Sequence, residues 1–174
     1  MNKQIIVVPY QEEWSKDYQS EAKRLTRIFR ESIMNIHHIG STSIPQMQAK
    51  PTIDILIEVS DLDIADHAAE EMIDAGYRAL GENGIKGRRY FSKENDAGDH
   101  LYHVHVFQAE SPEVIRHLAF RDYLRTHEED AVFYAEIKQQ LARSFPDDRD
   151  GYTTGKNAVI HQIEDRALQW WYNQ

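Results

Sequence analysis

Two short segments of the sequence carry residues suited to chemistry at alternate positions. The first, residues 52–59, contains Asp54, and the second, residues 100–107, contains His103 and His105. Because side chains alternate between the two faces of a strand, His103 and His105 would share one face. If the two strands pair with matching faces, both imidazoles would meet the Asp54 carboxylate. We predict that these three residues hold a divalent metal ion such as Mg, Mn or Zn.

The same residues are also compatible with a purely structural role. Two histidines on a strand are often rim or interior side chains that are hydrogen-bonded to neighbours. Asp54 could then simply pair with an arginine. The sequence leaves both interpretations open. We expect Glu58, further along the first strand, at a solvated strand end rather than in the site.

A turn of small residues, Gly40-Ser41-Thr42-Ser43, precedes Asp54 by about a dozen positions. Such a turn offers backbone N–H groups and hydroxyls to an anion. Alone, it could equally be an ordinary strand-to-helix turn with a serine cap. A hydroxyl-rich turn followed at this spacing by a carboxylate on a strand is typical of a nucleotidyltransferase site. We therefore predict Asp54 as a catalytic residue and Gly40, Ser41 and Thr42 as phosphate-binding residues.

Several basic residues lie close in sequence to these segments. Adjacent arginines on the predicted strand 87–92 face opposite sides, so at most one of them would serve a given site directly. Two arginines of the predicted helix 111–126, Arg121 and Arg125, are spaced i, i+4, and neighbouring acids could also pair with them. Lys156 is a weaker candidate near the start of the last helix. The basic residues that we predict to contact an anion are Lys50, Arg88, Arg89 and Arg121.

Length and composition restrict the classes of function. The chain has 174 residues, a formal net charge of −9 and no cysteine. This length fits one domain, residues 1–174, and the lack of cysteine excludes thiol catalysis and a cysteine zinc site. The negative charge argues against a nucleic-acid polymer as partner and suits a small anionic ligand or nucleotide in a local basic pocket. With no apolar run of transmembrane length and no signal-peptide pattern, we expect a cytoplasmic protein without a membrane partner.

Hydrophobic periodicity outlines the elements that must position these residues. Helices are expected at residues 11–34, 60–75, 111–126, 128–143 and 152–172. Strands are expected at 36–39, 52–59, 77–80, 87–92 and 100–107, after an edge strand or extended lead-in at 5–8. Central strands followed by a helical C-terminal third predict an α+β fold rather than a repeating βαβ sheet.

The chain resembles the GrpB family over its whole length. The resemblance is carried by the segments VVPYQEEW, HHIGSTSIPQMQAKPTIDILIEV, GRRYF, HLYHVHV and LAFRDYLRTHEEDAVFYAEIK, and by Tyr152 with Lys156. Its most specific parts are the tract 38–54 and the run 120–125. The resemblance implies a nucleotidyltransferase fold, in which helices flank a mixed β-sheet. It also implies that some relatives are fused to dephospho-coenzyme A kinase, while the family itself implies no particular reaction.

The nucleotidyltransferase pattern implied by this resemblance is incomplete. Gly40-Ser41 and Asp54 match it, but the position of the second carboxylate is taken by Leu56. The later strand offers His103 and His105 where a third acid would be expected. We therefore do not expect two-metal catalysis by three carboxylates. A single metal ion held by Asp and His, or no metal, fits these residues better.

Three functions remain open at the level of sequence. The first is a transferase that moves a nucleotidyl or phosphoryl group on a small anionic substrate. The second is a nucleotide- or phosphate-binding module without catalysis. The third is an accessory domain that acts through a protein partner, such as a kinase of the coenzyme A pathway. The sequence has no P-loop, so such a kinase would be a separate chain.

Overall fold

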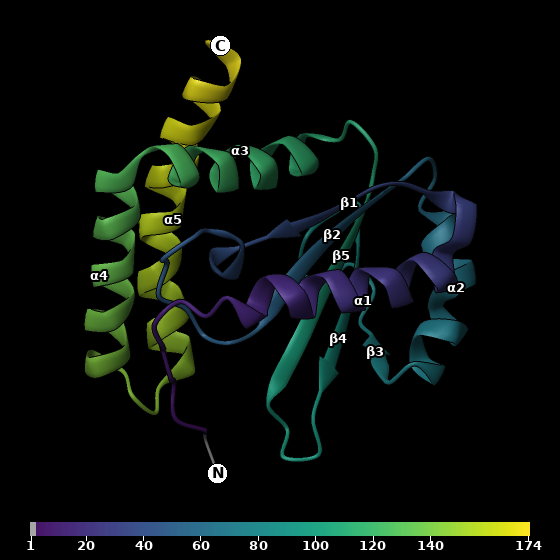
Figure 1. Ribbon diagram of the computed structural model, residues 1–174, viewed down its shortest axis with the longest axis horizontal. Helices are drawn as coiled ribbons and strands as arrows, with labels where there is room; N and C mark the ends of the chain where they lie inside the picture. Colours follow the sequence, from purple (N-terminus) through teal and green to yellow (C-terminus); the bar gives the residue numbers. More distant parts are fainter. Residues whose placement is uncertain (1–2) are drawn as a thin grey trace.

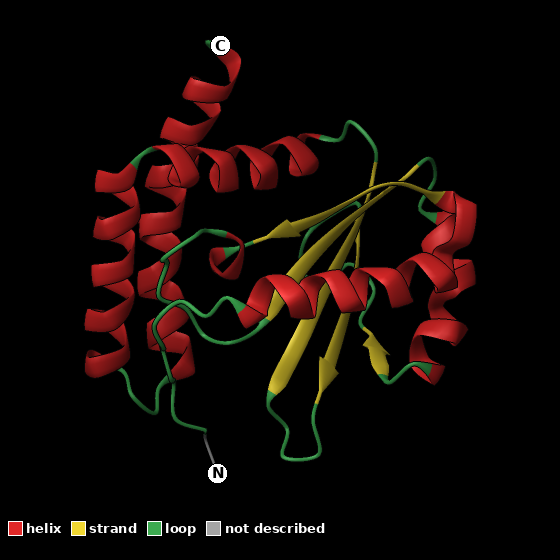
Figure 2. Ribbon diagram, viewed as in Figure 1, coloured by secondary structure: helices red, strands yellow, loops and turns green. Residues whose placement is uncertain are grey.

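The computed structural model describes residues 3–174, which form a mixed β-sheet flanked by helices (Figure 1). The strands are β1 (Ile33–Ile39), β2 (Ile53–Val59), β3 (Tyr77–Ala79), β4 (Arg88–Glu94) and β5 (His100–Gln108). The helices are α1 (Glu13–Phe29), α2 (Asp63–Asp74), α3 (Pro112–Thr126), α4 (Glu128–Ser144) and α5 (Arg149–Tyr172), with 3-10 turns η1 (Arg30–Ser32) and η2 (Ser41–Ser43). The predicted α+β class with a helical C-terminal third is confirmed (Figure 2).

The five strands lie in the order β1-β2-β5-β4-β3. The neighbours β2 and β5 run parallel, whereas every other pair in the sheet is antiparallel. The two strands on which the sequence places Asp54 and the His-x-His pair are therefore adjacent. A parallel pair needs a long crossover connection, and residues 60–99, with α2, β3 and β4, provide it.

One face of the sheet is covered by α1 and α2 (Figure 1). Ile55 and Ile57 of β2 and Val104 and Val106 of β5 point to this side and are fully buried. Fully burying a side chain of this size stabilises the fold by roughly 1.5–3 kcal/mol. The alternating pattern of both strands thus fixes which side faces α1 and α2, and it directs Asp54 and the histidines to the other side.

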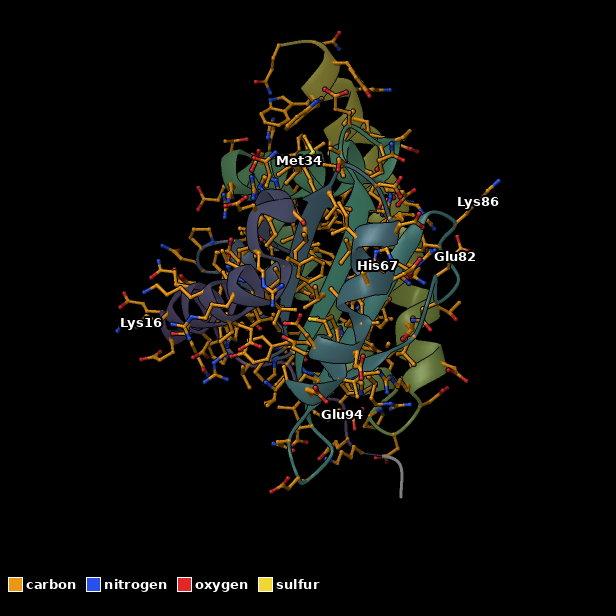
Figure 3. All side chains as sticks on the ribbon, turned by 90° about the vertical axis from the view of Figure 1, so that its right-hand side faces the viewer. Lys16, Met34, His67, Glu82, Lys86 and Glu94 are labelled. Atoms are coloured by element: carbon orange, nitrogen blue, oxygen red, sulfur yellow. The ribbon has the colours of Figure 1, made fainter. Side chains whose placement is uncertain are left out.

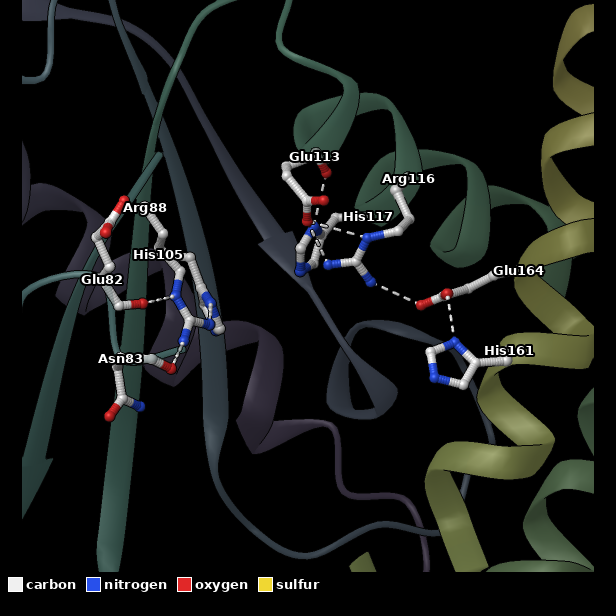
Figure 4. Close-up of polar contacts among 9 residues, drawn as sticks. All are labelled: Glu82, Asn83, Arg88, His105, Glu113, Arg116, His117, His161 and Glu164. Atoms are coloured by element: carbon white, nitrogen blue, oxygen red, sulfur yellow. Dashed lines mark hydrogen bonds and ion pairs between the residues drawn. The ribbon is translucent and has the colours of Figure 1, made fainter. Parts of the chain in front are cut away.

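The opposite face is covered in part by the C-terminal helices. Leu56 and Phe107 pack against Val114 of α3, and the three helices α3, α4 and α5 share a second apolar core. A partly buried ion pair also joins α3 to α5, since Arg116 Nη1 lies 2.6 Å from Glu164 Oε1 (Figure 4). These contacts hold α4 and α5 beside the part of the sheet where Asp54 lies.

The first helix is the main correction to the predicted elements. It ends at Phe29 rather than near residue 34, because Arg30 has a φ of 58° in the left-handed region and η1 follows. As a result, β1 begins at Ile33 instead of residue 36. The segment 5–8 is an extended lead-in, in which Val8 forms an isolated bridge with Ala49.

Glu58 was wrongly expected at a solvated strand end. It is buried, because Asn35 and His37 of β1 bind its carboxylate at 2.7 and 3.2 Å. Other charged side chains do occupy the surface, and Figure 3 shows Lys16 and Lys86 projecting from opposite sides of the molecule. Within residues 3–174, no helix combines the length and the apolar character needed to cross a bilayer.

Candidate functional site

The parallel pairing of β2 and β5 brings Asp54 and the two histidines together. In the register of these strands, Asp54 lies opposite His103 and Leu56 lies opposite His105. Nε2 of His105 is 3.1 Å from Oδ1 of Asp54, and Nδ1 of His103 is 3.5 Å from the same oxygen. The three side chains thus meet on one face of the sheet, as the alternation of side chains predicted.

Arg88 determines which nitrogen of His105 carries the proton. Its Nη1 lies 3.2 Å from Nδ1 of His105, while Nε and Nη2 donate to the carbonyls of Glu82 and Asn83 (Figure 4). A guanidinium group can only donate, so Nδ1 accepts and Nε2 carries the proton that His105 donates to Asp54. Burial lowers the pKa of His105, Asp54 opposes this effect, and the Arg88 cation adds to it. His105 is therefore neutral, and its Nε2–H donates to Asp54.

The Asp54 carboxylate is held in its ionised form. Burial alone would raise its pKa, but hydrogen bonding from His103 and His105 lowers the pKa well below its ordinary value. About 28% of the Asp54 side chain remains exposed, so a ligand can reach it. Further contacts run from Nε2 of His103 to Nδ1 of His100 at 2.9 Å, and from Nε2 of His100 to Glu94 at 3.4 Å. Asp54 thus lies at the end of a series of contacting polar side chains, and it is accessible to a ligand.

Gly40 allows the turn after β1 to approach Asp54 closely. Its φ is +72°, and an ideal Cβ on this residue would lie 2.9 Å from Oδ2 of Asp54. A side chain at this position would be strained and would also collide with the carboxylate. The turn continues into η2, where the hydroxyl of Thr42 lies 2.9 Å from Nε2 of His38. The glycine therefore places the hydroxyl-bearing turn directly beside the acid.

A cavity of 190 Å³ lies beside Asp54. Ser41 and Thr42 of the turn form one wall, and Asp54 and His103 form part of another. The helices α4 and α5 contribute two lysines and the ring of Tyr152. The three lysines that line the cavity are Lys50, Lys138 and Lys156. Hydroxyls, one carboxylate and three ammonium groups therefore share a single space.

No ion pair joins the three lysines to a carboxylate within residues 3–174. Lys138 is only 2% exposed, and it donates to the carbonyl of Gln48. Lys50 and Lys156 each lie 5.4 Å from the centre of the Tyr152 ring. Burial and the repulsion between the lysines lower the pKa of Lys138 to about 7 and that of Lys50 to about 8. The cavity is thus a concentration of positive charge in an acidic protein.

Lys138 and Tyr152 were not predicted as site residues from the sequence. Lys138 looks like one of many polar residues on a helix, but it lies in a stripe with the buried Tyr134 and the half-buried Leu141, at i, i+4 and i, i+7 spacing. A lysine within an apolar stripe is unusual, because buried lysines are rare unless they are paired. That position in the stripe is the signal that could have identified Lys138.

The predicted phosphate-binding residues separate into two groups. Gly40, Ser41, Thr42 and Lys50 lie in or beside the cavity. The three arginines have other partners within the described residues, and none of them is in the cavity wall. Arg89 faces α2 and lies 2.7 Å from Asp66, so adjacent arginines do point to opposite sides of the strand. Arg121 binds Asp122 at 2.7 Å and the carbonyl of His38 at 3.2 Å, while Arg88 holds His105.

The Asp54 cluster, as it is arranged here, does not fit a metal centre. Nε2 of His105 carries a proton, so it has no lone pair to give to a metal ion. The neighbouring position on the same strand face is Leu56, which is fully buried. In residues 3–174, no group of three or more histidine, aspartate or glutamate side chains is arranged to hold a metal ion. The metal site at Asp54, His103 and His105 stays a prediction from sequence.

Comparison with known proteins gives strong similarities over nearly the whole chain. A family model described as "GrpB protein" matches residues 4–166. The UPF0157 protein YqkA of Bacillus subtilis is 44% identical over 168 residues, which are 97% of this chain and 48% of that protein. The chain thus spans about half of that relative. A crystal structure of the conserved protein GrpB from Enterococcus faecalis has a TM-score of 0.91 at 40% identity, covering 96% of this chain and 99% of that one.

A more distant similarity concerns the fold alone. The Cid1 poly(U) polymerase, in a structure with MgGTP bound, has a TM-score of 0.55 at 11% identity. The match covers 78% of this chain and 44% of that one. The sheet and its flanking helices are therefore of the nucleotidyltransferase type.

Proposed function

The chain belongs to the GrpB family, and from that premise we propose that it binds a small phosphate-bearing molecule, a nucleotide first of all, in the cavity beside Asp54. One observation carries this proposal. Lys50, Lys138 and Lys156 come from the segment before β2, from α4 and from α5, line the same cavity and have no carboxylate in an ion pair with them within residues 3–174. Phosphate groups are the anions for which such a site is suited. The MgGTP complex of Cid1, which has the same type of fold, agrees with a nucleotide as ligand.

The reaction that best suits this site is transfer of a nucleotidyl or phosphoryl group to a hydroxyl of a second substrate. Catalysis of this kind depends mainly on positioning and on stabilisation of negative charge. The lysines and the hydroxyls of the turn would hold the phosphates. Asp54, which stays ionised, would accept a hydrogen bond from the attacking hydroxyl and orient it. As the new oxygen–phosphorus bond forms, the bond to the leaving group breaks, which releases pyrophosphate in nucleotidyl transfer or the nucleoside diphosphate in phosphoryl transfer. The hydroxyl proton passes to the leaving phosphate or to solvent.

Binding without transfer is the second candidate, and a specific residue favours it. Leu56 occupies the strand position at which the nucleotidyltransferase pattern has its second carboxylate, and it is fully buried. An aliphatic side chain cannot replace an acid in charge stabilisation. The chain would then retain the phosphate site of the fold and act as a sensor or carrier of its ligand.

Thermal melting with a panel of nucleoside triphosphates tests the proposed function. A ligand that binds the native state increases its stability by RT ln(1 + [L]/Kd) and therefore raises the melting temperature. We expect a shift with at least one triphosphate, in buffers with EDTA, Mg, Mn or Zn. Release of pyrophosphate that is lost in Asp54→Asn would favour transfer, and a shift without release would favour binding alone. If no phosphate compound shifts the melting temperature in any buffer, the proposed function is wrong and a protein partner becomes the next hypothesis.

A further inference from the structure

The acidic side of the cavity offers little to a cation. Oδ1 of Asp54 is occupied by the contacts from His103 and His105, and Oδ2 is packed against Gly40. The proton on His105 Nε2 is fixed by Arg88, so this imidazole is a donor rather than a metal ligand. A divalent ion could therefore bind only Oδ2 of Asp54, and Gly40 limits access to this oxygen.

Three lysines line the same cavity. Lys50 precedes β2, Lys138 belongs to α4 and Lys156 belongs to α5, so the fold brings three distant ammonium groups to one space. Lys138 is buried and Lys50 and Lys156 are half-buried, so these charges of the same sign are costly, because they lose hydration and repel one another. A bound anion would remove this cost. A divalent cation in the same space would increase it.

The size of the cavity limits which part of a ligand it can enclose. Its 190 Å³ is below the roughly 300–1,000 Å³ of pockets that bury a drug-sized ligand. A phosphate chain is narrow and has negative charge on each phosphate, so it matches the space and the three ammonium groups. The remainder of a nucleotide would lie outside the cavity.

From these observations we propose that the cavity binds a triphosphate chain as the metal-free anion, with Lys50, Lys138 and Lys156 supplying the positive charge that a divalent ion usually provides. This inference rests on the proposed function, since it concerns the same site. It adds that metal is not required for binding, and it identifies the polyphosphate chain as the part of the ligand that is recognised.

Inorganic triphosphate is the probe that tests this inference on the full chain. We expect calorimetry to show binding in EDTA that is as tight as binding in excess Mg²⁺, or tighter, because Mg²⁺ neutralises the ligand. Lys156→Gln should weaken this binding at least tenfold. Asp54→Asn should retain it, because the carboxylate repels the anion. Lys16→Met is the matched control, since Lys16 is exposed on α1, and it should bind as the parent does.

Two results would overturn the inference, and they separate it from the proposed function. Binding that requires Mg²⁺, Mn²⁺ or Zn²⁺ and is abolished by Asp54→Asn would show that a metal ion carries the charge, while phosphate binding itself would stand. Absence of triphosphate binding in every buffer would contradict both. Lys138→Met provides a second test of the lysines, and circular dichroism would verify that each variant is folded.

Discussion

Arg88 is a buried cation that acts on the candidate site through another residue. It is 6% exposed, and no carboxylate among residues 3–174 lies within ion-pair distance of it. Its partners are two loop carbonyls and Nδ1 of His105. By requiring Nδ1 to accept, Arg88 orients the N–H of His105 toward Asp54. Arg88 is therefore a positioning residue for the carboxylate.

Arg88→Met should release His105 from this constraint. We expect nitrogen-15 spectra of the imidazole to show one Nε2–H form in the parent and a mixture of tautomers in the variant. Stability should fall by about 1–3 kcal/mol, because buried acceptors lose their donor. The matched control is Arg89→Met, whose partly exposed pair with Asp66 should contribute less than about 1 kcal/mol and leave the His105 spectrum unchanged. A single Nε2–H form in Arg88→Met would show that Arg88 does not set the tautomer.

Strand parity made part of this site predictable from the sequence. Asp54, His103 and His105 meet because alternate residues on paired strands share a face, and that rule needs no knowledge of the loops. The role of Arg88 could not be predicted in the same way. Its partners are carbonyls of the loop before β4, and their position depends on how residues 81–87 fold.

At the scale of elements, the turn between β1 and η2 is the most restrictive connection near the cavity. It needs a residue with positive φ and without a side chain, since the turn packs against the Asp54 carboxylate. The sequence identified this turn because glycine and hydroxyl residues cluster in it. The close approach to Asp54 followed only from the pairing of β1 with β2, in which Ile39 lies opposite Asp54.

Gly40→Ala should therefore affect both stability and binding. The positive φ costs roughly 1 kcal/mol for a residue with a Cβ, and displacement of Asp54 adds to this cost. Gly81→Ala is the matched control, because Gly81 has a φ of +60° but no atom within 4 Å of its ideal Cβ. We expect urea unfolding to show a loss in both variants. The Kd for inorganic triphosphate should change in Gly40→Ala alone. An equal Kd in the two variants would exclude a role for the close contact between Gly40 and Asp54.

The packing of α4 against α5 explains why Lys138 escaped prediction and why Lys156 was only a weak candidate. Lys138 and Lys156 belong to separate helices, and they reach one space because the helices lie close together. An ideal Cβ on Gly155 would be 2.5 Å from Leu141, so glycine permits this approach. Periodicity predicted both helices and their ends within a few residues. It contains no information on which face of α4 meets α5.

At the scale of the whole molecule, positive charge is concentrated in one cavity of an acidic chain. The formal net charge is −9, whereas three lysines with lowered pKa values line the cavity. A local field of this kind raises the concentration of small anions at the site while the remaining surface repels polyanions. The sign of the overall charge follows from composition alone, but the lysine cluster depends on the tertiary fold.

Binding of inorganic triphosphate should consequently weaken between pH 7 and pH 9. In the free protein the pKa is about 7 for Lys138 and about 8 for Lys50, so both lose their protons over this range. Inorganic triphosphate has two terminal phosphates, and the last proton that it loses over this range makes the ligand more negative, which favours binding, so a weakening must come from the lysines. We expect calorimetry at constant ionic strength to show a Kd that rises at least tenfold. A Kd that is independent of pH would mean that these lysines do not hold the anion.

Lys138 should also reduce the stability of the unliganded protein, in a manner that depends on pH. Its pKa is lowered in the folded state from 10.5 to about 7, so between these values the unfolded chain binds more protons and stability rises with pH. Lys138→Met removes this dependence. We expect the variant to gain stability relative to the parent by an amount that is larger at pH 6 than at pH 9, by on the order of 2 kcal/mol. Urea unfolding at both pH values measures the difference, with Lys16→Met as the exposed control. A loss of stability that is the same at pH 6 and pH 9 would identify Lys138 as a structural residue, because the strain of an unpaired buried charge must vary with its protonation.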